Sequence, residues 1–565
     1  MSIQTTAPEP LAPVPFTIPS AFETELSNGL RVVVFDDPRL PLVSYRLVFY
    51  SGDSHDPEGN TGTTSAMASL MVEGTENYSS KELAEKIERL GASLNVGASD
   101  DFTSISASAL TIYSSEILAL MAEVVFRPTF PEDELDLYRR NTIENLKFQR
   151  SQPNFLANEQ TARILYGKHP YAVISPSAGD IERLTRESIV KLHAERIIPN
   201  NAVLIAVGDV DRESLLEEIE GHFGDWGRGN IVGLDSPKPP ERNARSITIV
   251  DRPGSAQSNI VMSNIGVDRS HPDYFPIMVM NQVLGAGASS RVFMNLREEK
   301  GYTYGAYTRF DMKRLSGEFE ATAEVRTAVT GDSIKEFFYE LDRIRTESVP
   351  EEELSDAKAY LTGVFPIRAE TQEGLTGLIV GQQLYGLPAD YLQTYRDKVD
   401  VVTIEDVKRV AAEHIHPDRI AIVIVGDAGE VLPQVKEFAE EIEIFDTDRN
   451  PKELSQFETN DLIADVDVTG DWLLSLDFQG QAVPVKLILE NSGDTITGTL
   501  ETMLGDGEVN QVSINGNKFS AVAVSEIQGQ PMELSINGKV DGDSMSGSIT
   551  VSIIPEPLTF TGSRG

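Results

Sequence analysis

The sequence of 565 residues contains no cysteine. Disulfide bonds, thiolate metal sites and thiol nucleophiles are therefore excluded, and the chain carries no indication of a redox compartment. It also lacks any run of about 20 apolar residues, so no transmembrane helix is expected.

Basic residues are scarce relative to acidic ones. Lys and Arg total 48 against 88 for Asp and Glu, which gives a formal net charge of -40. Because this acidity is spread along the chain, it argues against nucleic acid and anionic membranes as partners. A basic peptide would suit the charge, although general solubility explains it equally well.

The first residues, MSIQTTAPEPLAPVPF, have neither the basic start nor the apolar run of a secretion signal. We expect residues 1–21 to form an extended proline-rich arm. A cytoplasmic location without membrane insertion follows, and a periplasmic one stays open if Met1 is not the native start.

An internal repeat organises most of the chain. Pro199–Val210 and Pro417–Ala428 each contain a loop, a continuously apolar strand and a Gly-Asp pair, and they are offset by 218 residues. A threonine stands at the expected N-cap of the helix before each copy, at Thr185 and Thr403. The repeat predicts two homologous α+β lobes.

We expect the first lobe at 22–228, a Gly- and Pro-rich linker at 229–244 and the second lobe at 245–447. After a further linker at 448–467, the pattern changes to short alternating strands at 468–565, with turn signals such as Asn515-Gly and Asn537-Gly. This predicts a small all-β domain, an antiparallel barrel or sandwich. We expect Trp472 to fill its core rather than to bind a ligand.

A short segment after the first strands has the frame of a zinc-binding helix without its ligands. Gly62–Thr75 reads GTTSAMASLMVEGT, and it follows Leu26–Leu30 (LSNGL) and Gly52–Ser54 (GDS). In this order the three segments resemble the M16 peptidase family (pitrilysin/insulinase, processing-peptidase-like). That family carries the zinc motif H-x-x-E-H.

By this resemblance, Ser65 and Ser69 stand in the two histidine slots and Ala68 in the slot of the catalytic glutamate. A serine hydroxyl is a poor zinc ligand beside imidazole, and alanine has no proton to exchange. Farther along, YRRNTIENLKFQRSQP resembles the helix that supplies the third ligand, and Asn145 occupies that slot. The preceding carboxylate falls on Tyr138, and Glu144 is turned about 100° away. The sequence therefore predicts no metal in this chain.

The second half keeps a different part of the resemblance. Asn281–Tyr304 reads NQVLGAGASSRVFMNLREEKGYTY, and it resembles the C-terminal signature of the family. The resemblance implies that Arg297 and Tyr304 bind the substrate main chain and the scissile carbonyl, and that the loop with Gly285 and Gly287 contacts substrate. A guanidinium and a phenol can donate to a developing oxyanion. The alternative is that Arg297 only pairs with Glu298 or Glu299.

The other candidate site is weaker. His414-x-His416 resembles a metal pair, but it precedes Pro417 at an expected helix end and has no third ligand at a matching spacing, so we expect a capping or surface role.

Three functions fit these patterns. The first is a non-catalytic subunit of a heterodimeric M16 metallopeptidase, inactive alone, whose partner carries H-x-x-E-H and zinc and whose substrate is a peptide. The resemblance implies half-shell lobes that enclose a chamber when two such pairs meet. The second is a structural subunit of a larger complex, like the peptidase-derived core proteins of respiratory complexes. The third is a peptide-binding module.

Overall fold

The computed structural model describes residues 18–57, 59–234, 236–457, 466–478, 481–492, 495–502, 505–515, 517–527, 530–551 and 557–565. Most of the predicted arm at 1–21 and part of the predicted linker at 448–467 lie outside these ranges. The chain divides into two compact units, Met1–Phe457 and Glu458–Gly565.

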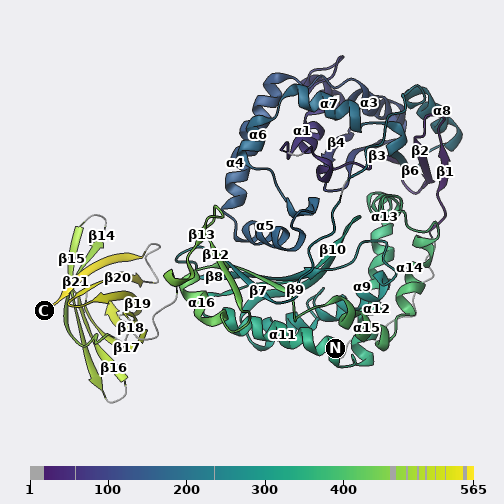
Figure 1. Ribbon diagram of the computed structural model, residues 1–565. Helices are drawn as coiled ribbons and strands as arrows, with labels where there is room; N and C mark the ends of the chain where they lie inside the picture. Colours follow the sequence, from purple (N-terminus) through teal and green to yellow (C-terminus); the bar gives the residue numbers. More distant parts are fainter. Residues whose placement is uncertain are drawn as a thin grey trace, which may run out of the picture. The chain divides into compact units, whose positions relative to one another are not determined.

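The first lobe contains a six-stranded sheet in the order β1-β2-β6-β3-β5-β4 (Figure 1). β2 and β6 run parallel, whereas the other neighbours run antiparallel. The strands are β1 (Phe22–Glu25), β2 (Arg31–Asp36), β3 (Leu42–Phe49), β4 (Ser93–Ala98), β5 (Thr103–Leu110) and β6 (Ala202–Gly208). The helices are α1 (Thr63–Leu70), α2 (Ser80–Arg89), α3 (Ser114–Phe126), α4 (Glu132–Arg150), α6 (Ala178–Arg183), α7 (Arg186–Arg196) and α8 (Arg212–Phe223).

The second lobe contains a seven-stranded sheet in the order β13-β12-β7-β11-β8-β10-β9, which places β9 at one edge. The strands are β7 (Ser246–Asp251), β8 (Gln257–Ile265), β9 (Thr303–Met312), β10 (Gly317–Arg326), β11 (Ala421–Gly426), β12 (Glu441–Phe445) and β13 (Pro451–Lys452). The helices are α9 (Tyr274–Leu284), α10 (Arg291–Phe293), α11 (Thr330–Thr346), α12 (Glu351–Glu370), α14 (Tyr391–Asp400), α15 (Ile404–His414) and α16 (Ala428–Val435). Within the described ranges, no helix is both long and apolar enough to cross a bilayer.

The repeat in the sequence corresponds to equivalent elements in the two lobes. β6 and β11 contain the repeated apolar runs, and both are buried along their whole length. The side chains of Thr185 and Thr403 accept the backbone N–H of the third helical residue and cap α7 and α15. The prediction of two homologous α+β lobes and of these two caps is confirmed.

The first lobe contributes one helix to the sheet of the second. α5 (Pro153–Tyr166) follows α4 in the chain, but it packs against β8 and β11. Its buried residues Leu156 and Ala157 belong to an apolar cluster with Val261 and Val423 of those strands. The contact is made by apolar side chains on both surfaces, so burial of apolar area stabilises it.

The second lobe contributes a helix to the first in return, and Figure 1 shows α5 and α13 each beside the opposite sheet. α13 (Gln372–Leu384) packs against β6 and β3. The side-chain amide of Gln372 donates to the carbonyl oxygens of Leu42 at 3.0 Å and Val207 at 2.7 Å. Arg46 of β3 pairs with Glu373 at the start of the helix. The exchange of helices makes the two lobes one compact unit.

The second unit is a closed antiparallel barrel, which decides between the predicted barrel and sandwich. Its strands are β14 (Gly470–Phe478), β15 (Gln481–Ser492), β16 (Thr495–Thr502), β17 (Gly505–Asn515), β18 (Lys518–Ile527), β19 (Gln530–Asp541), β20 (Ser544–Val551) and β21 (Leu558–Arg564). Trp472 is fully buried in the barrel core, as predicted, and its indole N–H donates to the carbonyl oxygen of Val468 at 2.8 Å.

One turn predicted in this unit is wrong. Asn537 and Gly538 do not form a hairpin turn but lie inside β19. A Cβ at Gly538 would lie 2.4 Å from a ring carbon of Phe519, so the glycine admits a buried aromatic ring against the strand. The turn comes later, at Gly542, which has a φ of +60°.

Candidate functional site

The helix with the zinc-motif frame, α1, is held by a carboxylate. It begins after Gly62, whose φ of +88° favours glycine. Asp56 accepts the backbone N–H of Gly62 at 2.6 Å and of Thr64 at 2.9 Å, and the Thr64 hydroxyl at 2.6 Å. Because the N-terminus of a helix carries partial positive charge, a carboxylate there stabilises it.

Two of the predicted ligand slots line one cavity. Ser65 of α1 and Asn145 of α4 lie in the wall of a cavity of about 1120 Å³, together with Tyr138. The Ser65 hydroxyl lies 2.9 Å and 2.8 Å from the two carboxylate oxygens of Asp53 and donates to that carboxylate. The structure therefore brings these two slots together but commits Ser65 to a hydrogen bond.

The remaining motif positions point elsewhere. Ala68 is fully buried, whereas Ser69 is exposed and is not part of the cavity wall. Glu144, next to the third slot, forms an exposed ion pair with Lys147 at 2.7 Å. Glu144 therefore does not replace the missing carboxylate at Asn145.

Titratable groups line the cavity, among them His55, which is buried, and Asp53 and Asp56, which are half-buried. Burial raises the pKa of Asp53 to about 6, which the hydrogen bond from Ser65 opposes and the nearby Asp56 and Asp100 reinforce. Burial also raises the pKa of Asp56, against the hydrogen bonds from Thr64. The pKa of His55 falls to about 4 because of burial and, secondarily, the charges of Arg196 and Arg314.

These residues do not fit a zinc ion. The slots offer a hydroxyl that already donates to Asp53, a buried methyl group, an exposed hydroxyl on Ser69 and a neutral amide, whereas zinc prefers imidazole, thiolate or carboxylate ligands. Sequence reasoning missed Asp53 and Asp56. The signal that could have found them is the pair of acidic residues in Asp53–Asp56, which precedes a helix whose N-cap residue, Gly62, has no side chain to accept the first N–H groups.

A His/Asp cluster lies in the second lobe. In the described part of the chain, one group of donor atoms lies close enough together to hold a metal ion, and it comes from His271, Asp273 and His414. His416 is not part of this group, and the two residues beside His414 lie more than 140 positions away in the chain, which is why the sequence shows no ligand at a matching spacing. Nε2 of His414 lies 3.0 Å from Asp273.

Arg409 supplies the positive charge that the Asp273 carboxylate of this cluster would otherwise take from a metal ion. Its guanidinium donates to both oxygens of Asp273, at 2.8 Å and 3.1 Å. These hydrogen bonds, followed by the one from His414, lower the pKa of Asp273 to about 2. We therefore assign the cluster to an ion-pair network that joins α9 to α15.

Arg297 and Tyr304 lie in the second lobe, in a π-helical turn (Met294–Glu299) and at the start of edge strand β9. Tyr304 is 90% exposed, and the Arg297 side chain is 45% exposed. Nε of Arg297 lies 3.4 Å from Glu298, so the alternative ion pair exists, and its guanidinium lies 4.8 Å from the ring centre of Phe293. An exposed pair of this kind is weak, which leaves the guanidinium available to a ligand.

The glycine loop before this turn has one position with a structural reason for glycine. Gly285 accepts the N–H of Thr308 at 2.9 Å, and a Cβ there would lie 2.3 Å from the Thr308 hydroxyl oxygen. Gly287 instead lines a cavity of about 520 Å³ that also contains Arg291 and Glu353, which are joined at 2.8 Å.

The sequence matches two protein-family models and is similar to curated proteins. The model "Insulinase (Peptidase family M16)" matches residues 31–174, and "Peptidase M16 inactive domain" matches residues 183–361. The zinc protease YmxG of Bacillus subtilis, described as uncharacterized, is 23% identical over 71% of this chain and 97% of its own length. A Helicobacter pylori protein described as the non-peptidase homolog YmxG is 21% identical over 71% of this chain and 93% of its length.

The fold is also similar to that of solved structures. The peptidase M16 inactive domain from Pseudomonas fluorescens is 27% identical, with a TM-score of 0.68 over 72% of this chain and 98% of its own. A protease from Helicobacter pylori has the same TM-score at 21% identity, over 72% of this chain and 99% of its own. More than a quarter of this chain thus extends beyond both structures.

Proposed function

Because this chain belongs to the M16 peptidase family, we propose that it is the zinc-free, non-catalytic subunit of a heterodimeric M16 metallopeptidase. The observation that carries the proposal is a contrast within the chain. The positions that would hold zinc are replaced and partly bonded internally, whereas Arg297 and Tyr304 are present and exposed. Their partner would be an M16 catalytic subunit that carries H-x-x-E-H and the zinc.

In this proposal, Arg297 and Tyr304 bind the substrate at the partner's zinc. A guanidinium and a phenolic hydroxyl can donate to the oxygen on which charge develops as the carbonyl is attacked. Tyr304 is the second residue of an edge strand, and a peptide can pair with such an edge through its main chain. Gly285 and Gly287 would contact the same peptide from the adjacent loop.

A basic peptide suits the charge of the cavity in the first lobe. Asp53, Asp56 and Asp100 line it, and the chain as a whole carries a net charge of -40. Lys168 and Arg196 also line the cavity, so its charge is not of one sign. We propose a preference for basic substrate segments on the balance of these charges.

Reconstitution with a defined partner tests the proposal. We would co-express the chain with each M16 protein of the same genome that carries H-x-x-E-H, and measure the mass of the complex, its zinc content and its cleavage of a quenched fluorescent peptide library. The proposal expects a one-to-one complex with one zinc and activity that neither chain has alone.

Three outcomes would count against it. Full activity of the partner alone would remove any catalytic need for this chain. Stable assembly into a larger complex without zinc or cleavage would support the structural role, and saturable peptide binding by this chain alone would support a peptide-binding module.

A further inference from the structure

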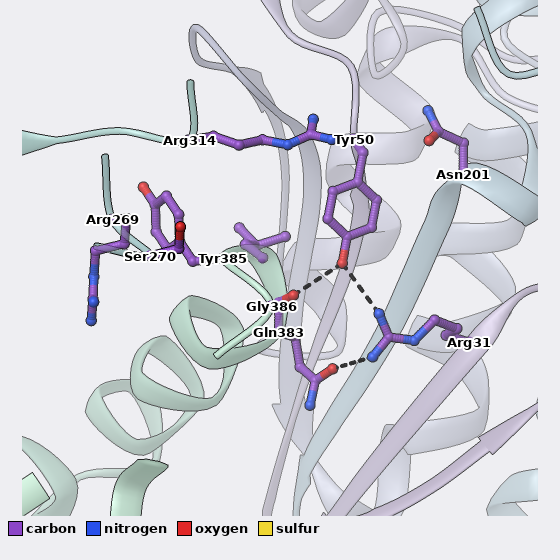
Figure 2. A pocket seen from close by; sticks show the side chains of 10 residues that line it. Arg31, Tyr50, Asn201, Arg269, Ser270, Arg314, Gln383, Tyr385 and Gly386 are labelled. Carbon is purple, nitrogen blue, oxygen red and sulfur yellow. Dashed lines mark hydrogen bonds between the residues drawn. The ribbon is translucent and has the colours of Figure 1, made fainter. Parts of the chain in front are cut away.

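Another pocket lies between the two lobes, and Arg297 is not one of its lining residues. It has a volume of about 470 Å³, and its wall includes Arg31, Tyr50, Arg269, Arg314, Gln383 and Tyr385. Arg31 begins β2, and Tyr50 directly follows β3 in the first lobe. The other four come from loops and from the end of α13 in the second half. Figure 2 shows this inter-lobe pocket with its arginine and tyrosine side chains.

Two of the three arginines form no ion pair within 4 Å among the described residues, although burial raises the pKa of Asp101 and the charge of Arg314 partly opposes that rise. Arg269 donates to the hydroxyl of Tyr391 at 2.7 Å, and its guanidinium lies 3.5 Å from the ring centre of Tyr274. The Arg314 guanidinium lies 5.5 Å from the ring centre of Tyr50. Asp101 accepts the backbone N–H of Arg314 at 3.2 Å, not its guanidinium.

The third arginine, Arg31, is held in position by neutral groups. It donates to the side-chain oxygen of Gln383 and, at 3.5 Å, to the hydroxyl of Tyr50. The Tyr50 hydroxyl in turn donates to the carbonyl oxygen of Gln383 at 3.1 Å. The carboxylate nearest Arg31 is Glu23, at 3.9 Å and 47% exposed, so this pair neutralises little of its charge.

This concentration of positive charge is unusual for the chain. Acidic residues outnumber basic ones by 88 to 48, yet in the described part of the chain no aspartate or glutamate lines the inter-lobe pocket. The end of α13 at Gln383 adds partial negative charge. That partial charge is about half an elementary charge, and the Tyr50 hydroxyl already donates to it, so three guanidinium groups outweigh it.

We propose that the inter-lobe pocket binds a small anion with two or more phosphate or carboxylate groups. Guanidinium groups donate in pairs to such oxygens, and a partly enclosed pocket strengthens these charge-assisted hydrogen bonds. The volume falls within the range of small-molecule sites. Since the arginines come from both lobes, the bound anion joins the lobes and stabilises the first unit. The site does not depend on a peptidase partner.

Titration calorimetry on the full chain alone tests this, with inorganic tripolyphosphate and citrate as probes. The wild type is expected to bind one of them, or both, at a single saturable site, and the tighter probe identifies phosphate or carboxylate as the preferred group. Arg314→Gln should weaken binding by roughly tenfold to a hundredfold, the effect of losing hydrogen bonds to a charged group. The double variant R269Q/R314Q should abolish it.

The control is R89Q/R140Q, which removes the same charge from two exposed helix positions and should bind like the wild type. If R269Q/R314Q does not fold, as judged by its circular dichroism, Arg314→Gln and Asn201→Asp decide instead, since the first removes a positive charge from the pocket wall and the second adds a negative one at nearly unchanged shape. Absence of saturable binding by the wild type, or equal weakening in the control, would overturn the proposal.

Discussion

The cavity beside α1 in the first lobe and the surface around Arg297 and Tyr304 in the second lobe differ in how their polar groups are bonded. In the cavity, Ser65 donates to Asp53 and Asp56 caps the helix, so the polar groups satisfy one another. At the surface, Tyr304 is almost fully exposed, and Arg297 contacts the ring of Phe293 and pairs with the exposed Glu298. Polar groups in the first region are thus bonded to one another, whereas those in the second are exposed and can meet a ligand.

The two lobes differ as well in how each holds the helix of the other. α5 is held by buried Leu156 and Ala157, whereas α13 adds amide hydrogen bonds from Gln372 and the Arg46–Glu373 pair to its own buried apolar residues, Leu375 and Ile379. The repeated topology therefore specifies where a helix lies, but not which interaction holds it there.

The largest effect is expected at Arg297. In the reconstituted complex, Arg297→Ala should lower kcat/KM by roughly a hundredfold to a thousandfold, or about 2.7–4 kcal/mol, because one donor to the developing oxyanion is lost. Peptide cleavage rates and the mass of the complex check this. Arg89→Ala, which removes an exposed arginine from α2, should leave the rates unchanged. Wild-type turnover in Arg297→Ala would leave the arginine with only its ion pair to Glu298.

The apolar anchor of α5 should dominate the stability of the first unit. Leu156→Ala is expected to cost about 3 kcal/mol of unfolding free energy, since it leaves a cavity between α5 and the sheet of the second lobe. Urea unfolding in a Trp472→Phe background makes Trp226 the reporter of this unit, because the chain has two tryptophans. Leu137→Ala, at an exposed position of α4, is the control and should change little.

The polar contacts of Gln372 in α13 should contribute less to the unfolding free energy of the first unit than Leu156 of α5 does. Gln372→Ala is expected to cost about 1–2 kcal/mol, because the carbonyl oxygens of Leu42 and Val207 lose a donor. The same Trp226 fluorescence assay measures it, with the exposed Gln456→Ala as control. A loss as large as that of Leu156→Ala would show that the two lobes are held alike.

The smallest effect concerns pH. Because the pKa of Asp53 is raised to about 6 in the folded state, that state holds a proton that the unfolded chain has released, and stability should fall as pH rises from about 4 to 6. Asp53→Asn should flatten this slope in urea unfolding at several pH values. Ser65→Ala, which removes a hydrogen bond to the carboxylate, should extend the slope to higher pH. An unchanged slope in Asp53→Asn would assign it to other groups.

Much of the fold could be predicted because it depends on local patterns. The apolar runs of β6 and β11 and the threonine caps of α7 and α15 are short-range signals, and each formed the expected element. The Asn537-Gly pair misled because a hairpin signal and a glycine that admits an aromatic ring look the same in sequence. The His414 cluster was missed because its members are far apart in the chain.

The sequence by itself determined which chemistry is absent from α1 and from Asn145 of α4, since serine, alanine and asparagine side chains do not supply the zinc ligands and the base of H-x-x-E-H. It also determined the repeat, because periodic apolar residues form the same elements wherever they recur. Only the tertiary structure decided which distant groups meet: Ser65 with Asp53, Arg409 with Asp273, and arginines of both lobes around one pocket. Contacts of this kind depend on how the sheets and the exchanged helices pack, and no local pattern encodes them.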